Sequence, residues 1–201
     1  MKGAYIHPLP IRIWHWINAF IVIMLIITGI QMRMPYISIF ESYRNVVLLH
    51  KYFGYAMTLS FLFWFFFYLI TGGFKKHYLL RLKDIKAIPE QAKYYMFGIF
   101  RARKNPHTPT GDNKFNPMQK ITYAAIMLIF TPVIAFTGIL FSDILYFFAW
   151  INALGGLRVL DAIHVMSAYI FVFYLIVHLY MSTLGKRFYS HIKSMITGYE
   201  D

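Results

Sequence analysis

The sequence predicts an all-α integral membrane protein, built as a four-helix bundle with both termini in the cytoplasm. The chain has 201 residues, of which 59% are apolar and 14% charged, and its mean hydropathy is +0.52. A soluble domain has fewer apolar residues and about 25% charged residues. The charged residues also lie between long apolar runs rather than within them. These observations predict one membrane domain that covers residues 1–201.

Four stretches are long and apolar enough to cross a hydrocarbon layer, which takes about 20 helical residues. They cover residues 13–32, 46–72, 121–141 and 159–184. The first has no small-residue cleavage site, so we expect it to be retained as a span. Residues 143–156 are too short and broken to cross, which predicts an interfacial helix or a re-entrant loop. The polar segment 73–115 is predicted to be a cytoplasmic loop.

The distribution of Lys and Arg predicts the orientation. Four spans place both termini and the segment 73–115 on one side of the membrane. That side carries all twenty Lys and Arg except Arg33, Arg44, Lys51 and Arg158. Cytoplasmic loops are enriched in Lys and Arg, so this side is predicted to be the cytoplasm. The net charge of +12 then indicates orientation and contact with lipid headgroups, and we expect no nucleic-acid partner.

Two histidines, His164 and His178, interrupt the apolar fourth span. At about 100° and 1.5 Å per residue, they share one helix face and lie roughly 21 Å apart along it. An imidazole inside a membrane is costly and needs a partner. His15 starts the first span at the cytoplasmic level of His178, and His50 starts the second span at the outer level of His164.

Two imidazoles at one level of a bundle can ligate the same haem iron. The pairs His15–His178 and His50–His164 therefore predict two b-type haems, one near each membrane surface. The chain has no cysteine, which excludes covalent c-type attachment and iron–sulfur ligation by this chain. One alternative is that these histidines are buried polar residues, hydrogen-bonded between helices. Another is zinc, which would need further ligands that the spans do not offer.

Small residues in the spans are compatible with a flat cofactor between helices, although they also serve ordinary helix packing. The glycines in question are Gly29, Gly54 and Gly138. The other histidines fall in the tails or the polar segment and are expected to be solvated, namely His7, His77, His107 and His191.

Four motifs carry a resemblance to a known family. They are RIWHW at Arg12–Trp16, LLHKYFGYA at Leu48–Ala56, KFNPMQKITY at Lys114–Tyr123 and IHVMSAYIFVFYLIVHLYM at Ile163–Met181. In this order they resemble the cytochrome b, or gamma, subunit of respiratory formate dehydrogenases. Relatives of that subunit serve membrane-bound nickel–iron hydrogenases and thiosulfate reductases.

The resemblance implies a four-helix subunit with two b haems and with the same pairing of histidines. It also implies a menaquinone site beside the cytoplasmic haem, formed by Asn116 and His178, with Gln119 nearby. A simpler interpretation of the same motif is helix entry, with Asn116 as the N-cap and Pro117 in the first turn. Both roles are compatible with one position at the membrane boundary.

The function implied is that of a dihaem b-type cytochrome subunit in the prokaryotic cytoplasmic membrane. It would transfer electrons between an extracytoplasmic iron–sulfur or multihaem cytochrome subunit and menaquinone, its exchangeable substrate. The chain would be the quinone-reactive part of an oxidoreductase complex. The alternative is a self-contained superoxide:quinone oxidoreductase like cytochrome b561. That enzyme needs a cationic funnel at the outer face, which Arg33, Arg44, Lys51 and Arg158 could provide.

Overall fold

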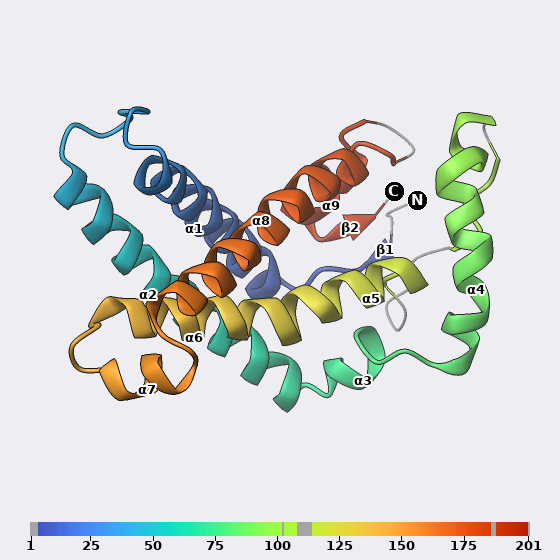
Figure 1. Cartoon of the computed structure of the whole chain (residues 1–201). Coiled ribbons are helices and arrows are strands. Elements are labelled where there is room, and N and C mark those ends of the chain that lie inside the picture. Colours follow the sequence, from blue (N-terminus) through green and yellow to red (C-terminus); the bar gives the residue numbers. More distant parts are fainter. Residues whose placement is uncertain (1–3, 102, 108–113, 186–187, 201) are drawn as a thin grey trace.

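Four long apolar helices form a bundle in the computed structural model, which describes residues 4–101, 103–107, 114–185 and 188–200 (Figure 1). The first two are α1 (Leu9–Arg33) and α2 (Tyr43–Ile70), and the fourth is α8 (Leu157–Ser182). The third combines α5 (Pro117–Ala125), the π-helical turn η3 (Ile126–Phe130) and α6 (Thr131–Ser142). Helix α1 packs on α2, α2 on α6, and α6 on α8. The predicted all-α membrane bundle is confirmed.

Local sequence signals set where the spans begin. Helix α1 starts four residues before the predicted span, at Leu9, because Pro8 and Pro10 favour a helix start. The Ser42 hydroxyl caps α2 by accepting a hydrogen bond from the backbone of Asn45. Helix α8 follows its N-cap residue Gly156, whose φ of 90° is a backbone conformation that glycine adopts readily.

The π-helical turn in the third span ends at Phe130, two residues before Pro132. Proline has no N–H to donate, so a regular α-helix would lose one backbone hydrogen bond here. The wider turn accommodates this, and the buried Thr131 hydroxyl donates to the carbonyl of Ile126 at 2.8 Å. The span stays continuous across the membrane despite its proline.

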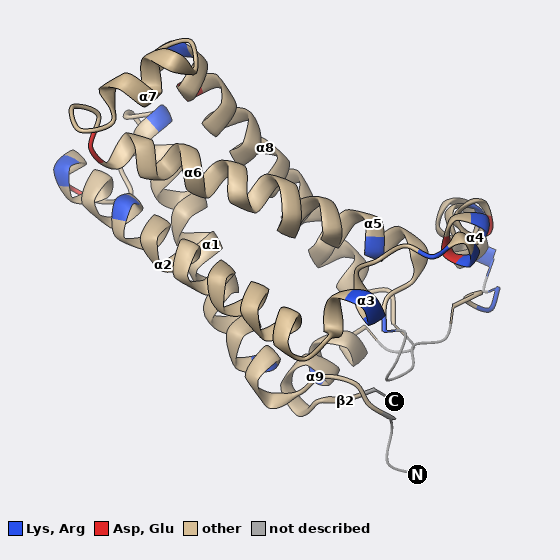
Figure 2. Ribbon diagram, turned by 90° about the horizontal axis from the view of Figure 1, so that it is seen from below, with Lys and Arg blue, Asp and Glu red and all other residues tan. Residues whose placement is uncertain are grey.

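Both ends of the chain meet at one end of the bundle. Strand β1 (Ala4–Tyr5) pairs antiparallel with β2 (Tyr199–Glu200), beside the short helix α9 (Ser190–Thr197). We call this the termini end, and the other the opposite end, where α7 (Phe148–Ala153) joins α6 to α8 (Figure 1). Figure 2 shows that Lys and Arg gather toward these two ends of the bundle.

The polar segment expected to be a loop is largely helical. It contains α3 (Gly73–His77), α4 (Leu82–Lys93), the π-helical turn η1 (Tyr94–Gly98) and the 3₁₀ turn η2 (Ile99–Arg101). His77 is buried rather than solvated, with its ring edge-on to Tyr68 at 6.3 Å and to Phe115 at 6.2 Å. Polar composition concealed this segment because α4 turns polar side chains, not apolar ones, toward the bundle.

Aromatic residues dominate the core at the termini end. Trp64 is fully buried, and its indole N–H donates to the Tyr78 hydroxyl at 3.2 Å. Ile11 and Tyr68 complete this cluster. Burial raises the pKa of Tyr78 well above its ordinary value, so this phenol stays neutral and holds α3 against α2.

Candidate functional site

The histidine pair at the opposite end joins α2 to α8. The rings of His50 and His164 have centroids 6.3 Å apart and planes inclined by 69°. The Nδ1 atom of His50 lies 2.8 Å from the hydroxyl oxygen of Thr28 on α1. The Nδ1 atom of His164 lies 2.8 Å from that of Thr137 on α6. Each ring is thus oriented by a threonine from a neighbouring helix.

These threonines determine the tautomer of both rings. The Thr28 hydroxyl donates to the carbonyl of Met24 at 2.7 Å, and the Thr137 hydroxyl donates to that of Val133 at 2.9 Å. A hydroxyl has a single hydrogen, so each oxygen accepts from its histidine and Nδ1–H is the donor. The Nε2 atom then carries the lone pair that a metal requires.

A glycine follows each of these threonines and lies against the same ring. A Cβ atom at Gly29 would be 3.4 Å from Cε1 of His50, and one at Gly138 would be 3.5 Å from Cε1 of His164. A methyl group would touch the imidazole, and a larger side chain would displace it. At Gly54, no described atom lies within 4 Å of such a Cβ. The Thr-Gly pairs therefore both orient and make room for the two rings.

The pair at the termini end joins α1 to α8. The rings of His15 and His178 have centroids 6.1 Å apart and planes inclined by 48°. Aromatic rings rather than hydroxyls flank this pair: Trp16 is edge-on to His15 at 5.2 Å, and Tyr174 stacks on His178 at 5.6 Å. The Nδ1 atom of His15 is buried and has no hydrogen-bond partner among the described residues. Such an atom calls for an explanation, and a bound cofactor supplies one.

The geometry of both pairs fits one iron atom between two imidazoles. A metal–imidazole bond is about 2 Å long and the nitrogen lies about 1.1 Å from the ring centre, so coaxial rings would have centroids about 6.2 Å apart. The observed separations are 6.1 and 6.3 Å. No His, Cys, Asp or Glu of the described residues adds a third ligand. Two axial donors suit haem, whereas zinc needs three or four ligands.

The structure gives Asn116 a structural role. Its side-chain oxygen accepts from the backbone N–H of Gln119 at 3.0 Å, and the Gln119 side chain accepts from the Asn116 N–H at 3.1 Å. The Asn116 amide also donates to the Tyr95 hydroxyl at 2.8 Å. Asn116 is buried and engaged at both ends, whereas Gln119 is half-buried. A quinone role for either residue stays a prediction.

Aromatic rings connect this helix entry with His178. Tyr123, two turns into the third span, is edge-on to Phe115 at 4.8 Å and to His178 at 6.5 Å. Burial raises the pKa of Tyr95, which lies beside Asn116, and its hydrogen bond from the Asn116 amide opposes that shift. Polar groups of the helix entry and the rings around His178 therefore form one continuous region.

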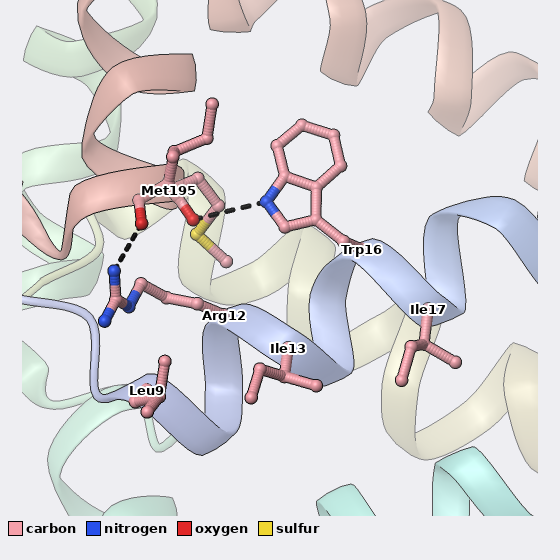
Figure 3. A pocket seen from close by; sticks show the side chains of 7 residues that line it. Leu9, Arg12, Ile13, Trp16, Ile17 and Met195 are labelled. Carbon is pink, nitrogen blue, oxygen red and sulfur yellow. Dashed lines mark hydrogen bonds between the residues drawn. The ribbon is translucent and has the colours of Figure 1, made fainter.

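A pocket lies beside the histidine pair of the termini end, between α1 and α9. It is open, has a volume of about 400 Å³ and is lined almost entirely by apolar atoms, with Trp16 in its wall (Figure 3). Trp16 donates to the carbonyl of Met195 at 3.3 Å, and Arg12 donates to that of Ile196. Trp16 therefore lies between this pocket and the ring of His15.

Sequence reasoning missed a buried ion pair next to the helix entry. Lys120 lies one turn after Asn116, and its ammonium group is 2.9 Å from the carboxylate of Asp84 on α4. Burial alone would raise the pKa of Asp84, but hydrogen bonds from Lys120 and from the backbone of Arg81 outweigh burial and lower it. The pair fastens α4 to the third span.

Sequence reasoning also missed Thr28 and Thr137. A signal was present, since ITGI at 27–30 and FTGI at 136–139 repeat one pattern in two spans. The repeat places a threonine hydroxyl next to a glycine, which has no side chain and leaves space on each helix. Only contacts between helices show that both copies face a histidine.

Comparisons with known proteins agree with this architecture. The model of the family described as prokaryotic cytochrome b561 matches residues 6–198. The cytochrome YdhU of Escherichia coli (strain K12) is 30% identical over 202 residues, which cover 98% of this chain and 75% of YdhU. Together with the four apolar helices, these matches show that the present chain is a multi-pass protein of the prokaryotic inner membrane. The chain belongs to the prokaryotic cytochrome b561 family, whose members bind haem b and transfer electrons within the membrane.

Proposed function

We propose that the chain is a dihaem cytochrome that carries electrons from one membrane surface to the other. His50 and His164 would hold one haem b, and His15 and His178 the other. The observation that carries this proposal is the ring separation, which fits an intervening iron at both ends of α8. A bound haem supplies an iron that alternates between its ferrous and ferric states, so each site holds one electron.

The residues around each pair prepare it differently for this task. Thr28 and Thr137 fix the tautomer at the opposite end and make each imidazole a stronger ligand. At the termini end, Trp16, Tyr174 and Tyr123 surround the rings with aromatic surface and limit access of water. The pair at the opposite end is rigidly oriented, whereas the pair at the termini end lies beside aromatic groups that suit an aromatic substrate.

We place the termini end in the cytoplasm, because that side carries most of the Lys and Arg. The quinone, a menaquinone by resemblance, would then react near His178. Gln119 is the better placed donor to a quinone carbonyl, because Asn116 is occupied by the helix cap and by Tyr95. The apolar pocket beside Trp16 suits an isoprenoid chain.

An extracytoplasmic iron–sulfur or multihaem subunit would exchange electrons with the haem at the opposite end. The rival function, a self-contained superoxide:quinone oxidoreductase, needs free cations there to attract an anion. Arg33 pairs with Asp161 at 3.3 Å, and Lys51 donates to the carbonyl of Ser142 at 2.9 Å. The charge of Arg33 is thus balanced by Asp161 and the side chain of Lys51 is held by a carbonyl, although Lys51 keeps its charge; the balanced Arg33 favours the subunit proposal.

The test is to count the haems and to remove them separately. A pyridine haemochrome assay should give a b-type spectrum at about two haems per chain. His164→Ala and His50→Ala should remove the same haem, and His15→Ala the other, in protein whose helical content is unchanged. One haem in the native chain, or loss of one haem by both His15→Ala and His164→Ala, would overturn the proposal.

A further inference from the structure

Helix α4 turns its polar face toward the bundle. Gln91 is 1% exposed and donates to the side chain of Asn105 at 3.2 Å, and Asp84 is paired with Lys120. Both residues lie on the same side of the helix, since seven residues are close to two turns. Surface helices of soluble proteins do the reverse and bury their apolar face.

The outward face of this segment carries large exposed apolar side chains. At about 100° per residue, Leu82 lies opposite Gln91, and Ile85 lies within about 60° of Leu82. Both are exposed, Leu82 to 79%. The exposed apolar face continues through η1 and η2 with Met96, Phe97 and Phe100, the last 75% exposed. We call the five exposed apolar residues of this face the outer stripe, namely Leu82, Ile85, Met96, Phe97 and Phe100.

Positive charge accompanies the outer stripe. The exposed cations of this segment are Lys83, Lys86, Lys93 and Arg101. Glu90 is the exposed acid of α4, because Asp84 is neutralised inside by Lys120. Long basic side chains beside an apolar strip can reach the phosphate level while their stems cover apolar surface. The pattern is that of a helix lying on an anionic membrane surface.

The position of α4 is consistent with such a surface. The helix runs crosswise to the spans at the termini end (Figures 1 and 2). The ion pair with Lys120 holds α4 to the first turn of the third span, and the hydrogen bond from Asn116 to Tyr95 holds η1, the turn that follows α4. The third span is predicted to enter the apolar layer near this turn, so α4 lies close to the level of the lipid headgroups.

We propose that residues 82–101 form an interfacial helix that binds anionic phospholipid. The outer stripe lies among the upper acyl chains, and the cations contact headgroup phosphates. Charge complementarity selects this occupant, because the exposed cations outnumber Glu90. The inference stands apart from the electron-transfer function and does not depend on it.

Site-directed spin labelling tests the proposal on the haem-loaded protein. The chain has no cysteine, so each introduced cysteine is a unique attachment point. Labels at Phe100→Cys and Ile85→Cys report the outer stripe, Glu90→Cys the charged flank, and Phe173→Cys, on α8 within the membrane, the acyl-chain interior. The protein is reconstituted in vesicles of phosphatidylglycerol and phosphatidylcholine, and an unchanged haem spectrum confirms that each variant is folded.

Collision of the labels with oxygen, which partitions into lipid, is compared with collision with a water-soluble nickel chelate. Labels at residues 85 and 100 should favour oxygen, though less than the label at residue 173, whereas the label at residue 90 should favour the chelate. In vesicles of phosphatidylcholine alone, the labels at 85 and 100 should move toward water. Three results would overturn the proposal: preference for the chelate at 85 and 100, shielding from both reagents, which indicates a covering protein, or an unchanged depth without phosphatidylglycerol.

Discussion

Single hydroxyl groups control the histidines at the opposite end. Thr28 and Thr137 each give their only hydrogen to a backbone carbonyl, so each must accept from an imidazole. This arrangement leaves Nε2 of both rings available and strengthens the imidazoles as donors. The two threonines are therefore expected to set the redox potential of this site and not that of the other.

Thr28→Val or Thr137→Val keeps the shape of the side chain and removes the acceptor. A stronger imidazole donor favours ferric iron, so its loss should raise the midpoint potential of one haem. A net hydrogen bond of ~1 kcal/mol corresponds to about 40 mV for one electron. Potentiometric titration with visible spectra measures the shift. Thr122→Val, whose hydroxyl bonds within its own helix, is the matched control and should leave both potentials unchanged.

The roles of Gln119 and Asn116 in quinone binding can be distinguished by removing the side-chain N–H₂ group of each in turn. Gln119→Glu keeps the oxygen that caps the helix and loses the N–H₂ group available to a quinone carbonyl. Asn116→Asp adds the same charge and keeps its capping oxygen. We expect electron exchange with menaquinone analogues to fall about fivefold more in the first variant than in the second, the worth of one hydrogen bond. Equal rates in stopped-flow reduction would place the quinone elsewhere.

At the scale of elements, α4 is attached by buried charge rather than by apolar packing. The Lys120 ammonium group and the Asp84 carboxylate contact each other, and both side chains are nearly fully buried from water. Removing one partner of such a pair leaves an isolated charge in a poorly polar environment. The attachment of α4 is consequently strong at neutral pH and sensitive to the loss of either charge.

Lys120→Met should destabilise the attachment of α4 by about 3–5 kcal/mol, and the double variant with Asp84→Leu should recover most of this loss. Lys86→Met, at an exposed lysine of α4, is the control. Limited proteolysis between α4 and the third span measures the change.

The attachment of α4 should also depend on pH. The folded pKa of Asp84 is lowered from its ordinary value of 3.8. The stabilisation that Asp84 contributes is therefore fully present above pH 3.8 and is lost as the pH falls through the lower folded pKa. Cleavage that is independent of pH in this range would contradict the assignment.

At the scale of the whole molecule, the sequence predicted what depends on spacing along one helix. The four spans and the level of each histidine follow from length and periodicity, and the structure brings together the rings at each level. Contacts between distant segments were not predictable in this way. Asp84 and Lys120 are 36 residues apart, and the polar inner face of α4 made its segment resemble a loop.

Orientation is the whole-molecule property still to be measured. In a chain without cysteine, Arg103→Cys probes the segment after η2, and Tyr36→Cys the turn between α1 and α2. A membrane-impermeant maleimide should label residue 103 only in inverted vesicles and residue 36 only in right-side-out vesicles, because the basic side stays in the cytoplasm. The reverse pattern would place the termini end outside.

Helix α8 supplies one histidine to each pair, and it is the last of these four spans to be synthesised. Neither pair is complete until translation has passed His178 and the fourth span has been inserted. If each pair holds a haem, as proposed, cofactor delivery follows insertion of all four spans, and the emerging chain is not loaded site by site. A chain interrupted before the fourth span contains no complete histidine pair. The truncated product is therefore expected to be a three-helix fragment without haem, rather than one that carries a single redox-active haem.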